Sequence, residues 1–174
     1  IFISIWSAHR SSHLSIPGQR QMCIAARFPG ALRRTLSTDE VAQLNRKLEQ
    51  ANGASQSSTL TLLNSDGLAV AASNWRSATS NVGQDYSFRP YVQQALAQGR
   101  GSFYGIGVTT GVPGYFLSQA IRDDSGHTLG LVVIKIALQE LEREWLQTPD
   151  IVLASDAHGV VFLASQDAWR YRLL

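Results

Sequence analysis

Two basic residues stand in surroundings typical of an anion-binding site. Arg89 follows Tyr86 by three residues, and Lys135 lies inside the apolar run 131–136. A guanidinium can bind a carboxylate through two N–H groups, and a nearby phenol adds a further donor. A lysine among apolar residues costs stability unless an anion pairs with it. We therefore predict an anion pocket, although Arg89 also fits a surface position at a helix start and Lys135 a water-facing strand position.

A glycine-rich segment between these two residues adds possible donors. It carries two adjacent threonines, Thr109 and Thr110, among the glycines Gly105, Gly107, Gly111 and Gly114. Glycines let a backbone approach a ligand closely and adopt positive φ. The segment matches neither the P-loop nor the dinucleotide fingerprint. It therefore predicts extra hydrogen-bond donors or an ordinary turn, but no nucleotide site.

The elements that would position these residues begin with a helix. Ser37 and Glu40 have capping-box spacing, and the apolar residues after them recur at helical intervals up to position 51. We expect this helix to end near Gly53 in a left-handed cap. From residue 58 the period becomes strand-like, and 59–63 and 68–72 predict a hairpin closed by the turn 64–67.

The remaining elements complete an α+β pattern. Pro90 suits the first turn of a short helix over 90–97, which Gly99 ends. Three strands are expected at 101–107, 115–122 and 128–137, with a turn at 123–126 between the last two, and then a helix over 139–145. This order predicts a PAS-like domain, in which helices flank a five-stranded antiparallel sheet.

An internal repeat suggests how the chain is divided into domains. The segment 62–73 recurs 92 residues later as 154–165. We therefore expect a PAS-like ligand-binding domain over 37–147 and the start of a second, truncated domain of this kind over 148–174. Residues 1–36 are interrupted by Pro17–Gly18 and Pro29–Gly30, which predicts an irregular arm or a degenerate helix.

Composition excludes several classes of protein. With 174 residues, 44% hydrophobic, 16% charged and a formal charge of +2, the chain is suited to a folded domain rather than to nucleic-acid binding. Its single cysteine, Cys23, permits no intrachain disulfide and no cysteine-based zinc site. His9 and His13 have helical i, i+4 spacing but lack the Glu of a zinc-protease motif, which favours surface positions. No Gly-x-Ser-x-Gly motif is present. We predict no cofactor and no metal, with a small hydrolase as a distant alternative.

Six segments, taken together and in order, resemble the periplasmic sensor region of the four-carbon dicarboxylate sensor histidine kinases, the DctB family. They are 72–75, 82–91, 103–104, 109–116, 131–136 and 169–171, and the resemblance runs from about residue 58 to residue 174. It implies a double PAS-like (PDC, or double Cache) ectodomain that binds succinate, fumarate or malate. The ligand-binding residues that it implies are Tyr86, Arg89, Lys135, Thr109 and Thr110, with Gly111, Tyr115 and Ser118 as further candidates.

The resemblance also implies a cellular setting. The chain would be the periplasmic portion of an inner-membrane protein, tethered by spans outside this segment, homodimeric in the full-length protein and without catalytic activity of its own. The same ectodomain on a chemoreceptor or a diguanylate cyclase is the alternative. Residues 1–36 depart from the family, which has a long regular helix there, and this puts dimerisation and signal transmission in doubt.

Overall fold

The computed structural model describes residues 32, 36–53, 58–138, 143, 145–147, 150–155 and 159–174. The described residues up to Ile136 belong to one compact unit, and those from Ala137 onward belong to another. Within the described residues no helix is both long enough and apolar enough to cross a membrane. The expected arm over 1–36 and the expected helix over 139–145 lie almost entirely outside these residues.

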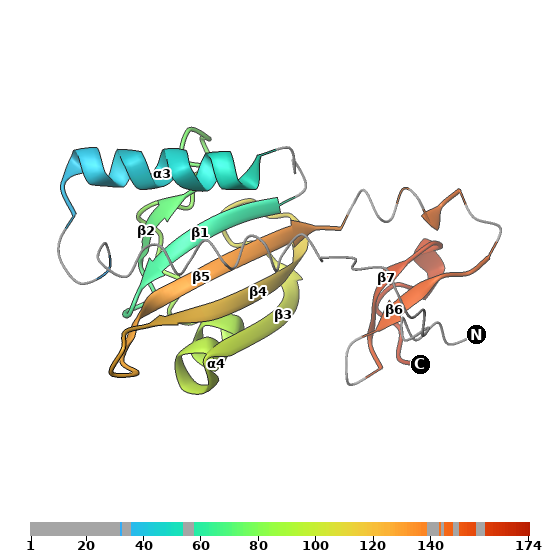
Figure 1. Cartoon of the computed structure of the whole chain (residues 1–174). Coiled ribbons are helices and arrows are strands. Elements are labelled where there is room, and N and C mark those ends of the chain that lie inside the picture. Colours follow the sequence, from blue (N-terminus) through green and yellow to red (C-terminus); the bar gives the residue numbers. More distant parts are fainter. Residues whose placement is uncertain are drawn as a thin grey trace, which may run out of the picture. The chain divides into compact units, whose positions relative to one another are not determined.

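The first unit opens with helix α3 (Thr38–Asn52), shown in Figure 1. Its N-terminus has the predicted capping box: the Ser37 amide donates to Glu40 Oε2 at 2.9 Å, and the Glu40 amide donates back to Ser37 Oγ at 3.4 Å. At the other end Gly53 has φ 44° and ψ −119°, so the expected left-handed cap is wrong in its ψ angle. Glycine reaches this conformation because it has no Cβ.

A five-stranded sheet forms the centre of this unit (Figure 1). Its strands are β1 (Ser58–Asn64), β2 (Ala69–Ala72), β3 (Arg100–Ile106), β4 (Pro113–Arg122) and β5 (Thr128–Ala137). They lie in the order β2-β1-β5-β4-β3, so the long strands β5 and β4 are central. Strand β1 pairs antiparallel with both β2 and β5, and β3 pairs antiparallel with β4. The predicted α+β fold with a five-stranded sheet is confirmed.

Both faces of the sheet are covered, and strand alternation divides the core between them. On β5, Val132 and Ile134 face the cluster beneath α3, whereas Leu131 and Val133 face the cluster beneath α4. Residues along a strand point to opposite faces in turn, so a strand covered on both sides is apolar throughout. This explains the continuous apolar run in β5.

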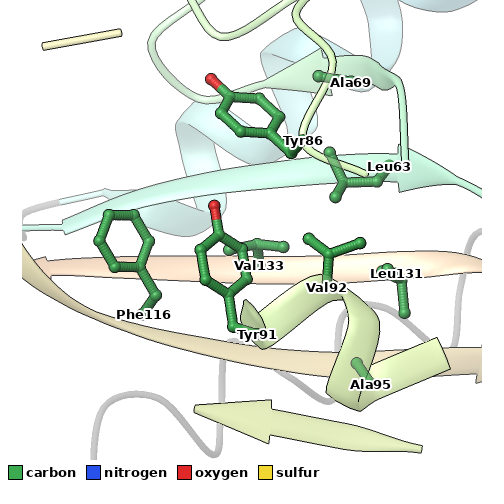
Figure 2. Close-up of a cluster of buried hydrophobic side chains, with 9 residues drawn as sticks. All are labelled: Leu63, Ala69, Tyr86, Tyr91, Val92, Ala95, Phe116, Leu131 and Val133. Atoms are coloured by element: carbon green, nitrogen blue, oxygen red, sulfur yellow. The ribbon is translucent and has the colours of Figure 1, made fainter. Parts of the chain in front are cut away.

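Helix α4 (Pro90–Gln98) covers the second face. Arg89 is its N-cap residue, Pro90 starts its first turn, and Gly99 ends it in the left-handed conformation with φ 85°. Figure 2 shows the apolar cluster that α4 shares with the sheet, in which Tyr86 and Tyr91 present their hydroxyl groups. The side chain at the N-terminus of α4 is therefore placed next to a buried aromatic cluster.

The second unit contains the predicted repeat of the first hairpin. Strands β6 (Leu153–Ser155) and β7 (Val161–Ala164) pair antiparallel, and the short 3-10 helix η1 (Asp167–Trp169) follows them. Each Cα partner pair of β1 and β2 recurs 92 residues later in β6 and β7, including the irregularity after the second pair. The likeness of the two sequence segments is thus also a likeness of register.

One side-chain contact repeats at the same offset. Ser73 Oγ accepts from the Leu60 amide at 3.0 Å, and Ser165 Oγ accepts from the Val152 amide at the same distance. In both hairpins a serine hydroxyl accepts a backbone N–H just beyond the last paired residues of the two strands. The two hairpins therefore end in the same way.

We predict that Leu48→Ala will lower the free energy of unfolding by about 2–5 kcal/mol, because it leaves a cavity between α3 and the sheet. Leu48 is only 2% exposed. Urea denaturation followed by circular dichroism measures the change. Gln43→Ala, at an exposed position of the same helix, is the control and should shift stability by no more than about 0.5 kcal/mol. Equal losses in the two variants would contradict this packing.

Candidate ligand-binding site

A small cavity of about 30 Å³ opens on the α4 face of the sheet. Its lining comes from β1, β4, β5, the start of α4 and the two long loops of the unit. Five of the eight predicted site residues line it: Tyr86, Arg89, Thr109, Thr110 and Lys135. The other lining residues are Thr59, Thr61, Leu63, Asn74, Asn81, Tyr91, Gly107, Val108, Phe116 and Val133.

Lys135 lies on the pocket face of β5, two residues beyond the buried Val133. Its Nζ donates to Thr110 Oγ1 at 2.7 Å and to the carbonyl of Val112 at 2.9 Å. Burial lowers the pKa of this amine below its ordinary value, because desolvation disfavours the charged form. The water-facing alternative for Lys135 is therefore wrong, since the side chain enters the pocket.

Two glycines make room for this lysine. A Cβ atom on Gly107 would lie 2.7 Å from Lys135 Nζ, and one on Gly114 would lie 2.8 Å from Lys135 Cε. Both distances are shorter than real Cβ contacts, so any other residue would push the lysine or the loop aside. The glycines of this segment thus serve the approach of a side chain, which the sequence pattern alone did not indicate.

Arg89 enters the pocket from the N-terminus of α4. Its Nη2 donates to the carbonyl of Ile106 at 3.0 Å, and its guanidinium lies 5.6 Å from the ring centroids of Tyr91, Phe103 and Phe116. A guanidinium has five N–H donors. In the described part of the chain one of them donates to the Ile106 carbonyl, the group also interacts with the Tyr91 hydroxyl, and no carboxylate pairs with it. Arg89 is therefore half-buried among aromatic rings with donors to spare.

Two tyrosines complete the wall beside Arg89. The Tyr86 hydroxyl lies 2.6 Å from Thr109 Oγ1, and burial raises the Tyr86 pKa, opposed by this hydrogen bond and by the Arg89 charge. Tyr91 stacks on Phe116 with centroids 4.9 Å apart. Burial raises the pKa of Tyr91 to about 12, again opposed by Arg89. Both phenols are therefore neutral donors at physiological pH.

The charged side chains among the described lining residues, Arg89 and Lys135, are both positive. Lys135 Nζ and the Arg89 guanidinium lie 5.8 Å and 5.6 Å from the centroid of the same ring, that of Phe116. None of the described residues that line the pocket is acidic. Two like charges in a partly desolvated site repel each other, and an anion between them removes that cost. The arrangement favours an anionic ligand with two charged ends.

Three predicted site residues lie elsewhere. The Gly111 amide donates to the carbonyl of Gly107 at 2.7 Å, so it is used inside the loop. The Ser118 hydroxyl donates to the carbonyl of Tyr91 at 2.6 Å and joins β4 to α4. Tyr115 and Ser118 both border a separate, more open groove of about 420 Å³. Motif proximity suggested these residues. The loop uses the Gly111 amide, and alternation in β4 turns Tyr115 to the other face from Phe116. Ser118 shares the face of Phe116, but it lies under α4 and bonds to that helix.

Four polar residues of the lining were not predicted: Thr59, Thr61, Asn74 and Asn81. Period-2 alternation in β1 places both threonines on the pocket face, which the sequence could have indicated. The two asparagines belong to the long loop between β2 and α4. Asn81 Nδ2 donates to Thr61 Oγ1 at 2.8 Å, a contact between segments with no common pattern.

The loop that carries these asparagines is also fastened to α3. Trp75 Nε1 donates to Glu49 Oε2 at 3.1 Å, and Arg76 Nε lies 3.3 Å from Glu49 Oε1. Arg76 also stacks over the Trp75 ring at 4.3 Å. One carboxylate of α3 therefore holds two consecutive residues of the loop.

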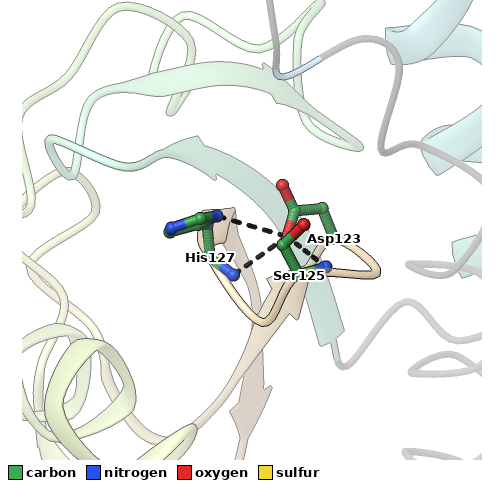
Figure 3. Close-up of polar contacts among 3 residues, drawn as sticks. All are labelled: Asp123, Ser125 and His127. Carbon is green, nitrogen blue, oxygen red and sulfur yellow. Dashed lines mark hydrogen bonds and ion pairs between the residues drawn. The ribbon is translucent and has the colours of Figure 1, made fainter.

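The β4–β5 turn contains serine, histidine and aspartate together, but not in a catalytic arrangement (Figure 3). Asp123 Oδ1 accepts from the backbone amides of Ser125 and His127, both at 2.9 Å, and lies 3.7 Å from His127 Nδ1. Within the described residues no hydrogen bond joins the Ser125 hydroxyl to the imidazole, and no group of three metal-ligating side chains occurs. The carboxylate closes a turn, so these residues give no support to the hydrolase alternative.

The fold and pocket define a PAS-like sensor domain of the Cache class, and comparison with known proteins gives the type. No protein-family model matches the chain. The C4-dicarboxylate transport sensor protein DctB of Rhizobium meliloti is 33% identical over 129 residues, which are 74% of this chain and 21% of that protein. The DctB sensor domain of V. cholerae superposes with a TM-score of 0.74 at 29% identity, over 91% of this chain and 60% of that structure. The chain contains a DctB-type sensor domain.

The chain spans about a fifth of the length of the curated relative it matches. The ligand-binding domain of the Pseudomonas fluorescens chemoreceptor CtaA, solved with L-alanine, has a TM-score of 0.64 at 19% identity over 90% of this chain and 65% of that one. At this identity the likeness concerns the fold alone.

We predict that Tyr91→Phe will reduce the loss of stability at alkaline pH. The pKa is 10.0 for an ordinary tyrosine and about 12 for Tyr91. A raised pKa contributes stability below the unfolded value and loses it as pH rises through the folded one, so the wild type should weaken across this window more than the variant. Urea midpoints over that range measure the effect. Tyr171→Phe, at an exposed position, controls for loss of a phenol, and parallel curves for all three proteins would refute the prediction.

Proposed function

We propose that this domain is an extracytoplasmic sensor that binds short, four-carbon dicarboxylates. The observation that carries the proposal is the pair of cations, Arg89 and Lys135, which enter one pocket whose described lining has no acidic side chain. Each cation takes one carboxylate, Arg89 through its planar fork and Lys135 as a point charge. Tyr86 and the two threonines add neutral donors at the same wall.

The charge pattern favours a dicarboxylate over an amino acid. An α-amino acid brings an ammonium group, which needs a carboxylate or several acceptors in a buried site. The ammonium group of such a ligand needs an anionic partner, but the charged side chains of the described lining are two cations. A diacid satisfies both cations, so the pocket suits a different ligand from that of CtaA although the fold is shared.

Binding requires the glycine-rich loop to move. At about 30 Å³ the cavity holds roughly one water-sized body. Thr110 Oγ1 and the Val112 carbonyl are the acceptors of Lys135 in this conformation. A ligand carboxylate replaces these neutral acceptors with a charged one, which makes a stronger hydrogen bond to the amine. The loop then moves outward and makes room for the ligand.

The output of the sensor lies outside this chain. Similarity to DctB supports a two-component sensor histidine kinase, held in the inner membrane with this segment in the periplasm and acting as a homodimer. The hairpin β6–β7, which repeats the register of β1–β2, supports residues 148–174 as the start of a second PAS-like domain. A chemoreceptor or a diguanylate cyclase with the same ectodomain is the alternative, and the sequence of the output domain decides between them.

We expect Arg89→Ala to weaken succinate binding by about 2 kcal/mol or more, roughly 30-fold, because it leaves one carboxylate unpaired in a partly desolvated pocket. Calorimetric titration of the purified chain measures this. Arg100→Ala is the matched control, since Arg100 is exposed and lines the other groove. An unchanged dissociation constant in Arg89→Ala would place the ligand elsewhere.

A second experiment tests whether both cations are used. The wild type should bind succinate more tightly than butyrate, which has the same chain length and one carboxylate. Lys135→Met removes the charge at similar length, so it should weaken succinate by about tenfold or more and affect butyrate less. Titration of both ligands with both proteins gives the ratio of affinities. Equal affinity of the wild type for the two acids would defeat the dicarboxylate assignment.

A further inference from the structure

The sheet has two buried hydroxyl groups, those of Ser118 and Thr61, and they differ in whether a hydrogen bond within the fold takes the proton. Ser118 Oγ donates its proton to the Tyr91 carbonyl, within the fold. Thr61 is 4% exposed and lines the pocket, and its Oγ1 accepts from Asn81 Nδ2 at 2.8 Å. Among the described residues no hydrogen bond uses the Thr61 proton. Thr61 is therefore a buried donor at the pocket wall.

The orientation of Asn81 is set by its own neighbours. Its amide N–H donates to Asn74 Oδ1 at 3.2 Å, and its Oδ1 lies 3.4 Å from Asn74 Nδ2, which also donates to the Thr79 carbonyl at 3.0 Å. With its Oδ1 facing an N–H donor, Asn81 presents its Nδ2 to Thr61. The threonine oxygen is then an acceptor, and its O–H must turn to another group.

The strand register places Thr61 close to Lys135 on the same wall of the pocket. In the β1–β5 ladder Thr59 is the partner of Lys135, and Thr61 is the partner of Val133. Thr61 is thus two residues along the strand from the level of Lys135, about 7 Å. A four-carbon diacid with a carboxylate at Lys135 brings the substituents of its middle carbons within reach of this hydroxyl.

We propose that Thr61, oriented by Asn81, is a specificity-determining donor for an oxygen substituent on the carbon chain of the bound dicarboxylate. This inference rests on the proposed function and deepens it, because it assigns the pocket to 2-hydroxy or 2-oxo diacids rather than to unsubstituted ones. A site with a fixed buried donor discriminates against an analogue that leaves that donor unpaired. The donor has one position on a chiral wall, so it distinguishes the two enantiomers of a hydroxy acid.

The experiment compares succinate with both enantiomers of malate by calorimetric titration of the wild-type chain and two variants. Thr61→Val keeps the shape and removes the hydroxyl, and Thr61→Ser restores it. For one enantiomer, Thr61→Val should lower the affinity for malate relative to succinate by about 3- to 10-fold. Thr61→Ser should keep the wild-type ratio. Thr61→Ala repeats the comparison if the valine variant does not fold.

The readout is a ratio because Thr61 also holds Asn81. Loss of that structural contact weakens succinate and malate together and leaves their ratio unchanged. A ratio that is the same in the wild type and in Thr61→Val, for both enantiomers, overturns the inference while the dicarboxylate function stands. Failure of the wild type to bind either acid overturns the function and the inference together.

Discussion

The structure of the pocket depends on one unfavourable placement, a lysine on the inner face of a sheet strand. Lys135 follows Leu131 and Val133 on a face that α4 covers, so its charge is partly desolvated. Two hydrogen bonds to the glycine-rich loop offset part of that cost. A Cβ atom on Gly107 or Gly114 would meet the lysine side chain, so a substitution there would displace the lysine or the loop. The two glycines thus fit this placement of the lysine.

Coverage of both sheet faces accounts for where the site lies. Helix α3 closes one face with apolar side chains and the buried Asn45, whose Oδ1 accepts from the Ala72 amide, and α4 closes part of the other. Helix α4 begins at Pro90, and the pocket beside its N-terminus is lined by Arg89 and by residues of two loops. The pocket lies on the second face, beside the N-terminus of α4 and between the two loops.

The helices and strands were largely predictable from local sequence patterns. The contacts of the pocket were not, because they depend on tertiary packing. The capping box, the hairpins and the order of elements are short-range features, and they predicted the helices and strands well. Arg89 and Lys135 were identifiable from residue type, whereas their burial depends on which elements cover them. Motif proximity ignores alternation in β4, which turns Tyr115 to the other face from the pocket residue Phe116. Ser118 shares the face of Phe116, but its hydroxyl is bonded to the Tyr91 carbonyl of α4, a tertiary contact that no local pattern encodes. Asn81 meets Thr61 only through the path of an irregular loop, which no periodicity encodes.

That irregular loop is also the segment through which the pocket and α3 share contacts. In the middle of the loop, Asn81 bonds to Thr61 on the pocket wall. Near the start of the loop, Trp75 and Arg76 are held by Glu49. The outer contacts are partly exposed, so each contributes little to stability and is easily exchanged. A ligand that touches Asn81 therefore acts on a loop that α3 holds weakly. These contacts connect the pocket to α3. A bound ligand shifts α3 only if it binds one arrangement of this loop more tightly than another.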